Sequence, residues 1–334
     1  MKKKVVVYKK LAPSLIAELE SRFDVTAFDG VNDGNRAAFM AALAEAEGMV
    51  GASVKFDAAM LAKAGKLRIA STISVGFDTF DTAFLRQRGI VLTHTPGVLT
   101  ETVADTVFAL ILATARRVVE LAEFVKAGRW ERSIGPDLFG TDVHDKTIGF
   151  LGMGRIGAAV ARRARLGFGM KVIYHDLHAA PSVEADFAAV RLPIERVLAE
   201  ADFVCALLPL LPSTEKLVDA AAFARMKRSA FFINGSRGRV VDEAALIEAL
   251  RAGTIAGAGL DVFEKEPLPA ASPLLSMPNV VALPHIGSAT HETRAAMAET
   301  AVADLIAGLE ERKPAHLVDE SVWQARYADA GGMA

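Results

Sequence analysis

The sequence has 334 residues, about twice the ~150 residues of a typical domain, so two domains are expected. Lys and Arg total 38 against 40 Asp and Glu, and this balance excludes the strong basic excess that nucleic-acid binding needs. A content of 52% hydrophobic and 23% charged residues is typical of a globular chain rather than a disordered one. The single cysteine, Cys205, excludes an intramolecular disulfide and predicts a thiol packed inside an apolar run.

The N-terminus begins with Met1 and three lysines, which resembles the start of a signal peptide. Only residues 5–8 follow before two more lysines, which is too short for an apolar segment of about 7–15 residues. No apolar run approaches the ~18 residues of a membrane span. We therefore expect a soluble, cytoplasmic protein with neither a membrane nor a nucleic-acid partner.

Strand-like apolar runs alternate with helical patterns through the first hundred residues. Strands are expected at 5–8, 49–51, 67–72 and 90–93, and helices at 14–22 and 36–46. A turn at Thr95-Pro96-Gly97 then precedes one long helix, expected over 103–126 and stopped by Gly128. A helix of this length would connect two domains or form a subunit interface.

A second alternating series occupies residues 146–283. Strands are expected at 147–151, 171–174, 203–207, 230–234, 257–261 and 280–283, and helices at 155–166, 194–199, 220–226 and 242–252. A further helix is expected at 290–309, and the last four residues, 331–334, are expected to fray. Five or six strands with crossover helices predict an α/β domain with a doubly wound parallel sheet.

Three glycines follow the first strand of this second series. Gly152, Gly154 and Gly157 fit the G-x-G-x-x-G pattern in the strand–turn–helix order of a dinucleotide site. Gly152 would permit the tight turn, Gly154 the close approach of pyrophosphate, and Gly157 the packing of helix against sheet. The free amides at the helix start favour binding of a diphosphate. The alternative interpretation of these glycines is a tight turn that binds no ligand.

Asp176 ends the next strand, about 20 residues beyond the glycines, where an acid holds the adenosine ribose. A carboxylate there would repel a 2′-phosphate, which favours NAD over NADP. A turn aspartate is the alternative. His175 and His178 flank it, but without a further ligand they predict an exposed turn and no metal site.

Arg237, Glu266 and His285 each follow a different predicted strand of the second series. Carboxyl ends of parallel strands share one edge of a sheet, so the three side chains are expected at one site. An arginine can grip a carboxylate through two parallel hydrogen bonds, and a histidine beside a carboxylate can act as acid and base. Each residue considered alone has an ordinary alternative: a surface arginine for Arg237, a solvated loop glutamate for Glu266 and a structural histidine for His285.

The chain resembles the D-isomer-specific 2-hydroxyacid dehydrogenases over roughly residues 1–315. The similarity rests on residues 152–157, 234–242, 259–267 and 284–288. Segments 71–76, 133–137 and 285–294 resemble the branch of glyoxylate, hydroxypyruvate and 2-ketogluconate reductases.

The resemblance implies a role for each candidate residue. Arg237 would bind the substrate carboxylate and carbonyl, His285 would donate the proton, and Glu266 would pair with His285. The backbone amides of Val75 and Gly76 would also hold the carboxylate. Besides the glycines and Asp176, the cofactor contacts would be Arg155, Ile156, Pro209, Thr214, Asn234, Ser236, Asp261 and Ser288.

The resemblance also implies an α/β fold of two doubly wound Rossmann-like domains with parallel sheets. The substrate-binding domain would be discontinuous, 1–100 with 286–334, and residues 101–285 would form the NAD(P)-binding domain. A homodimer would form through the helix of residues 101–128 and the loop after it. The reaction would be reduction of a small 2-oxo acid to the D-2-hydroxy acid, with NAD(H) favoured, NADP(H) possible and no metal.

Two other activities of the family are not expected. Phosphite dehydrogenases carry lysine where this chain has Val75, and formate dehydrogenases carry glutamine where it has Glu266. A non-enzymatic alternative is an NAD-binding corepressor, because corepressors of this family keep the same Arg, Glu and His.

Overall fold

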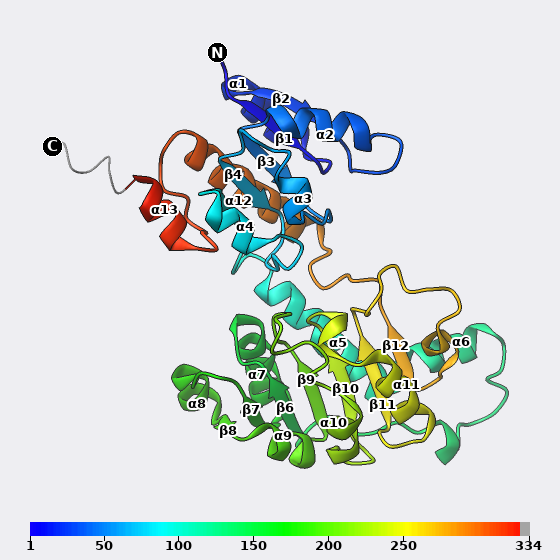
Figure 1. Cartoon of the computed structure of the whole chain (residues 1–334). Helices are drawn as coiled ribbons and strands as arrows, with labels where there is room; N and C mark the ends of the chain where they lie inside the picture. Colours follow the sequence, from blue (N-terminus) through cyan, green and yellow to red (C-terminus); the bar gives the residue numbers. More distant parts are fainter. Residues whose placement is uncertain (328–334) are drawn as a thin grey trace. The chain divides into compact units, whose positions relative to one another are not determined.

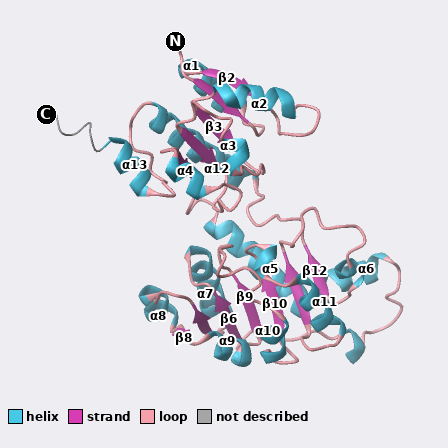
Figure 2. Cartoon of the chain, in the orientation of Figure 1, coloured by secondary structure: helices cyan, strands magenta, loops and turns pink. Residues whose placement is uncertain are grey.

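The structure, a computed structural model, describes residues 1–327. The chain divides into two compact units, one formed by Met1–Leu99 with the chain from Thr290 onward, the other by Thr100–Ala289. The boundary expected after residue 285 therefore falls after Ala289. The tail at 331–334, expected to fray, lies outside the described residues. Each unit is an α/β structure in which strands alternate with helices (Figure 2).

The first unit contains a five-stranded parallel sheet in the order β2-β1-β3-β4-β5. Its strands are β1 (Lys4–Val7), β2 (Asp24–Ala27), β3 (Gly48–Gly51), β4 (Ile69–Thr72) and β5 (Val91–Thr93). All residues of β3, β4 and β5 are buried, as expected for strands covered on both faces. The edge strand β2 was not predicted, because none of its residues is buried and only main-chain pairing to β1 defines it.

Helices of the first unit come from both ends of the chain. They are α1 (Pro13–Arg22), α2 (Arg36–Glu45), α3 (Ala58–Leu61), α4 (Thr82–Gln87), α12 (His291–Leu309) and α13 (Glu320–Tyr327). The late helix α12 packs on β3 and β4 (Figure 1). The approach is so close that a Cβ on Gly308 would lie 2.4 Å from Ile69. This packing makes the C-terminal segment part of the first unit.

The second unit contains seven parallel strands in the order β12-β11-β10-β9-β6-β7-β8. They are β6 (Thr147–Leu151), β7 (Lys171–His175), β8 (Val190–Arg191), β9 (Phe203–Ala206), β10 (Phe231–Asn234), β11 (Gly257–Leu260) and β12 (Val280–Ala282). The two-residue strand β8 is exposed and was not predicted. Strand order reverses between β6 and β9, so the sheet is doubly wound, and the predicted fold class is confirmed.

Five helices connect these strands: α7 (Arg155–Phe168), α8 (Pro181–Phe187), α9 (Ile194–Glu200), α10 (Ala220–Arg225) and α11 (Glu243–Arg251). Short 3-10 turns lie at Pro136–Leu138, Gly238–Val240 and Pro273–Ser276. The core of the sheet buries Cys205 completely, and this burial raises the pKa of its thiol, so the predicted packed thiol is confirmed. Within residues 1–327, every helix is too short or too polar to span a lipid bilayer.

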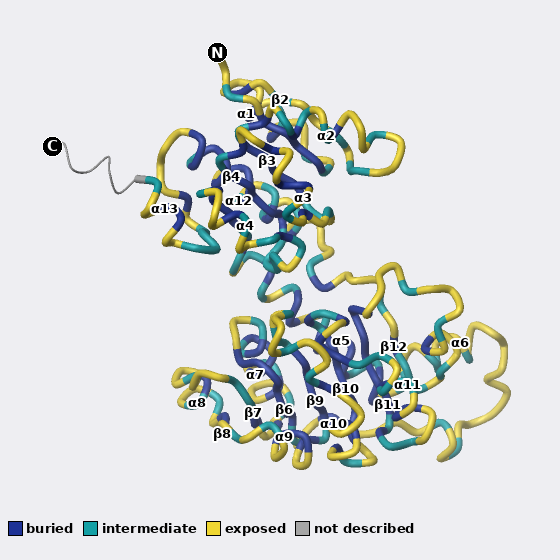
Figure 3. Tube along the Cα trace, viewed as in Figure 1, coloured by how far each residue is buried: buried dark blue, intermediate teal, exposed yellow. Residues whose placement is uncertain are grey.

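The single helix predicted over 103–126 is wrong, because the chain breaks into α5 (Thr100–Ala115) and α6 (Val118–Lys126). Arg117 lies between them in the left-handed region, with φ +55°. Its guanidinium donates to both carboxylate oxygens of Glu120, at 2.7 and 2.8 Å, and to the carbonyl of Asp137 at 2.6 Å. These contacts offset the backbone cost of the break. Helix α5 packs on β10 and β11, whereas α6 buries no residue (Figure 3).

Candidate active site

The site residues expected in the second unit all follow the carboxyl ends of its strands, at one edge of the sheet. The glycine turn follows β6, Asp176 follows β7, and Pro209 and Thr214 follow β9. Asn234 ends β10 and is followed by Ser236 and Arg237, Asp261 and Glu266 follow β11, and His285 and Ser288 follow β12. Open parallel sheets bind ligands at this edge, where the strand order reverses.

The glycine turn after β6 has the geometry of a phosphate cradle. Gly152 has φ +95°, and a Cβ there would lie 2.6 Å from the carbonyl oxygen of Leu207. A Cβ on Gly157 would lie 2.7 Å from the Gly152 carbonyl oxygen, so α7 packs directly on the turn. Above Gly154 there is open space, with no described atom within 4 Å of a Cβ. Gly154 caps α7 without a side-chain hydrogen bond, so the amides at Arg155 and Ile156 fit an anionic diphosphate.

Asp176 ties the end of β7 to this turn. Its carboxylate accepts hydrogen bonds from the backbone N–H of Met153 at 2.8 Å and of His178 at 3.0 Å. Arg191 of β8 donates to the carbonyl oxygens of Asp176 and Leu177 at 2.9 and 2.8 Å. Arg191 was not among the predicted site residues, because only sheet pairing brings the short strand β8 beside β7.

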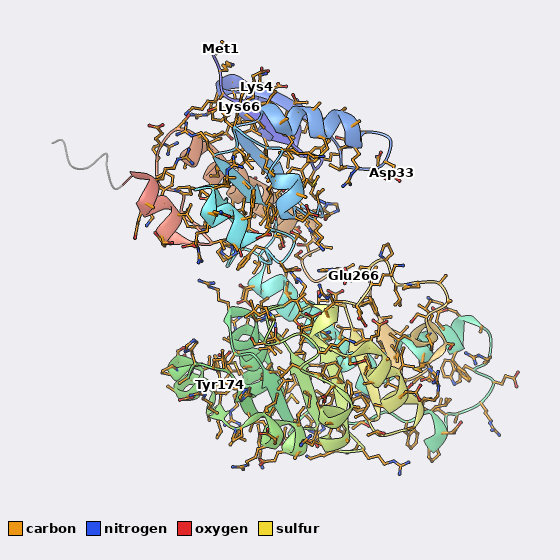
Figure 4. The ribbon with its side chains drawn as sticks, viewed as in Figure 1. Met1, Lys4, Asp33, Lys66, Tyr174 and Glu266 are labelled. Atoms are coloured by element: carbon orange, nitrogen blue, oxygen red, sulfur yellow. The ribbon has the colours of Figure 1, made fainter. Side chains whose placement is uncertain are left out.

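Glu266 and His285 form a hydrogen-bonded pair across the ends of β11 and β12. His285 Nδ1 lies 2.7 Å from one carboxylate oxygen of Glu266, and the N–H of Phe263 donates to the other at 3.0 Å. Figure 4 marks Glu266 among the loops beyond this edge of the sheet. An ionised carboxylate only accepts hydrogen bonds, so Nδ1 of His285 carries the shared proton and Nε2 is left for a substrate.

Burial raises the pKa of Glu266, but the hydrogen bonds from His285 and Phe263 and the charges of His285 and Arg237 outweigh it. The net pKa is lower than the ordinary value of 4.5, so Glu266 stays ionised at neutral pH. The pair therefore keeps a negative charge beside the imidazole.

The turn that carries His285 is anchored by Asp261. His285 has φ +55°, a backbone conformation that costs a non-glycine residue on the order of 1–3 kcal/mol. The side chain of Asp261, only 4% exposed as a residue, accepts from the N–H groups of Ile286 and Gly287 at 2.7 and 2.8 Å. Burial raises the pKa of Asp261, and these two amides partly offset the rise. The family resemblance implies only a cofactor contact for Asp261, and the structure adds this anchoring role.

Arg237 is brought near Glu266 by the close contact of two loops. A Cβ on Gly238 would lie 1.8 Å from the carbonyl carbon of Phe263, so the backbones after β10 and β11 touch. Asn234 shapes the arginine loop, because its side chain donates to the Arg237 carbonyl at 3.1 Å and accepts from the N–H and hydroxyl of Ser236. Asn234 and Ser236 are both buried.

Other expected residues lie at the edge of the site or in the first unit. The Thr214 hydroxyl donates to the Pro209 carbonyl at 2.6 Å and closes the loop after β9. Ser288 is half-buried beyond β12. Val75 and Gly76 are half-buried in the first unit, on the segment that follows β4.

A doubly wound sheet with a glycine-rich turn at its switch point, beside an Arg–Glu–His set, defines a nucleotide-dependent oxidoreductase. The family model "D-isomer specific 2-hydroxyacid dehydrogenase, NAD binding domain" matches residues 108–287. A protein of Serratia proteamaculans named glyoxylate/hydroxypyruvate reductase B is 57% identical over 309 residues, 92% of this chain and 95% of the relative. The chain belongs to the D-isomer-specific 2-hydroxyacid dehydrogenases and is an enzyme that works with a nicotinamide cofactor.

Solved structures agree with this assignment. A Thermus thermophilus protein, TT0316, has a TM-score of 0.87 and 42% identity, covering 95% of this chain and 100% of that one. An NADPH-dependent glyoxylate/hydroxypyruvate reductase of Sinorhizobium meliloti, in complex with NADP and malonate, has a TM-score of 0.84 and 33% identity, covering 96% and 98%. The two relatives named as reductases give no support to the corepressor alternative.

Proposed function

We propose that this enzyme reduces glyoxylate and hydroxypyruvate to the corresponding 2-hydroxy acids, of D configuration where the product is chiral. The Glu266–His285 pair beside Arg237 is the observation that carries the proposal. The names of the relatives support these two substrates. 2-Ketogluconate is a third candidate, because it has the same carboxyl–carbonyl unit.

The roles of the three side chains follow from their chemistry. The Arg237 guanidinium holds the substrate carboxylate through paired, charge-assisted hydrogen bonds and so fixes the adjacent carbonyl. When bound, the reduced nicotinamide supplies a hydride to the carbonyl carbon. His285 donates a proton from Nε2 to the carbonyl oxygen as negative charge develops there, and Glu266 stabilises the imidazolium that precedes this transfer.

The cofactor would be held by the turn Gly152–Gly157 and by Asp176, with further contacts from the loops after β9, β10, β11 and β12. We infer that NADH is favoured over NADPH, because the Asp176 carboxylate lies at the turn where a 2′-phosphate would meet its charge. The exposed guanidinium of Arg191, bonded to the backbone of the same turn, leaves positive charge through which NADPH could also bind.

A homodimer is part of the proposal. Helix α6 and the loop after it expose apolar side chains at Val118, Val119, Val125, Trp130 and Phe139, with Trp130 at 63% exposure. Exposed large apolar side chains gathered on one helix and its following loop favour a protein interface, and a second copy of this chain would cover them. Val119→Asp is expected to shift the molar mass in solution from dimer to monomer. Val190→Asp, at an exposed valine on β8, serves as the control.

The central test follows the loss of near-ultraviolet absorbance of NADH or NADPH with glyoxylate, hydroxypyruvate, 2-ketogluconate and pyruvate. Turnover of glyoxylate and hydroxypyruvate above pyruvate is expected, with a higher kcat/KM for NADH. Absence of turnover with every 2-oxo acid would contradict the proposed function. A strong preference for NADPH would contradict only the role given to Asp176.

A further inference from the structure

In the segment after β4, the carbonyl oxygens of two consecutive residues, Ser74 and Val75, each accept a hydrogen bond. The carbonyl oxygen of Ser74 accepts from the backbone N–H of Thr95 at 3.0 Å. The carbonyl oxygen of Val75 lies 2.9 Å from Nδ1 of His94. Both contacts come from neighbouring residues at the end of β5, the strand that pairs with β4.

These contacts fix the direction of two amide groups. In a planar trans peptide, the C=O of one residue and the N–H of the next point in opposite directions. Holding the Ser74 carbonyl therefore orients the N–H of Val75, and holding the Val75 carbonyl orients the N–H of Gly76. Neither of these two N–H groups donates a hydrogen bond within residues 1–327. Two consecutive N–H groups without a protein acceptor are an arrangement that suits an anion.

The position of His94 is fixed by its backbone N–H, by its ring and by Nδ1. Its backbone N–H donates to the carbonyl of His316 at 3.1 Å, and its ring meets the ring of Phe77 edge-on, with centroids 5.7 Å apart. His316 in turn pairs through Nδ1 with the buried carboxylate of Asp304 at 2.9 Å. A carbonyl oxygen only accepts, so Nδ1 of His94 must carry the proton that binds Val75.

We propose that His94 is a positioning residue, which orients the Gly76 amide so that Val75 and Gly76 together bind the carboxylate of the 2-oxo acid. This inference rests on the proposed function, because the 2-oxo acid reduced there supplies the carboxylate that these two amides would bind together with Arg237. The carboxylate is not the reacting centre, so its hydrogen bonds contribute equally to the bound substrate and to the transition state. If the Gly76 amide loses its orientation, KM should therefore rise and kcat should stay nearly unchanged.

The test compares His94→Phe with His94→Asn. Phenylalanine keeps an aromatic ring against Phe77 but cannot donate, whereas the amide nitrogen of asparagine stands where Nδ1 stood and can donate. His94→Phe is expected to raise KM for glyoxylate about 5- to 10-fold, with kcat within about 2-fold, the loss expected for one neutral hydrogen bond. His94→Asn should restore KM to within about 2-fold of the unsubstituted enzyme.

A binding measurement separates this role from catalysis. The dissociation constant of malonate, titrated calorimetrically into the enzyme–NADH complex, should rise by the same factor in His94→Phe, while that of NADH stays unchanged. His144→Phe, at an exposed histidine of the other unit, is the matched control. If the His94→Phe variant does not fold, His94→Gln, whose donor lies one carbon farther out, replaces it in the comparison with asparagine.

Unchanged KM and malonate affinity in His94→Phe would overturn the inference, as would an equal loss in His94→Asn. Those results would leave the proposed function standing if glyoxylate is still reduced. An unsubstituted enzyme that neither reduces a 2-oxo acid nor binds malonate would contradict the proposed function, and this inference with it.

Discussion

Replacing Glu266 by glutamine changes one atom of the pair that is proposed to supply the proton. In the unsubstituted enzyme, the Glu266 carboxylate accepts one hydrogen bond from the N–H of Phe263 and one from Nδ1 of His285. A glutamine side chain has only one accepting oxygen, and the backbone N–H of Phe263 is an obligatory donor. The amide NH2 would then face Nδ1, which can meet it only as the neutral, accepting tautomer.

The magnitude follows from the bond that is lost. Hydrogen bonds to charged groups contribute about 1.5–3 kcal/mol, so the transition state for proton donation by His285 should lose that much stabilisation. At about 1.4 kcal/mol for each factor of ten, kcat for glyoxylate reduction should fall roughly 10- to 150-fold. Stability should change little, because the His285 and Glu266 side chains are 47% and 36% exposed.

The assay measures kcat with NADH and with NADH deuterated at the transferred position, so that the isotope effect shows whether chemistry limits the rate. Glu264→Gln, on the same loop with its side chain exposed, is the matched control and should keep full activity. The NADH dissociation constant should stay unchanged in both variants. A Glu266→Gln enzyme that keeps more than half of kcat with a full isotope effect would refute the role of the pair.

Four further outcomes are expected. Because the net pKa of Glu266 lies below 4.5, kcat/KM should show no loss from protonation of this group between about pH 5 and 7; a fall there that Glu266→Gln abolishes would contradict this. Asp261→Ala leaves the amides of Ile286 and Gly287 without their acceptor, so kcat should fall about tenfold, and urea denaturation should show a loss of about 2–4 kcal/mol of unfolding free energy. Asp176→Ala should weaken NADH about tenfold more than NADPH in a fluorescence titration, and equal weakening would count against its ribose role. Burial raises the pKa of Asp202, but Lys227 at 2.8 Å and the Thr147 N–H at 2.9 Å outweigh it, so the net pKa is below 3.8. Its contribution to stability is present above pH 3.8 and is lost as pH falls through the native pKa, so Asp202→Asn should lower Tm at pH 7 and have a smaller effect near pH 2.

Local chemistry explains why much of the site was visible in the sequence. The turn at Gly152 needs glycine because of its positive φ and its contact with Leu207, and such requirements leave a readable pattern. Strands buried on both faces, such as β9 and β10, are continuous apolar runs that are found without any partner. The places of Arg237, Glu266 and His285 after successive strands followed from the same periodicity.

Elements defined only by a neighbour were missed or mistaken. β2 and β8 have too few buried residues to give an apolar signal, and sheet pairing alone makes them strands. The break at Arg117 depends on Glu120 and on carbonyl groups some twenty residues later, so helix periodicity could not reveal it.

The alternating α/β pattern, the glycine turn and the residue types available for chemistry can be read from short stretches of sequence, because each depends on a few neighbouring residues. The folded chain is needed to show that Nδ1 of His285 faces Glu266, that Asp261 anchors the histidine turn, and that His94 holds the Val75 carbonyl. Each of these bonds joins segments that adjacent strands bring together. Their geometry depends on sheet order and register, which no short stretch of sequence specifies.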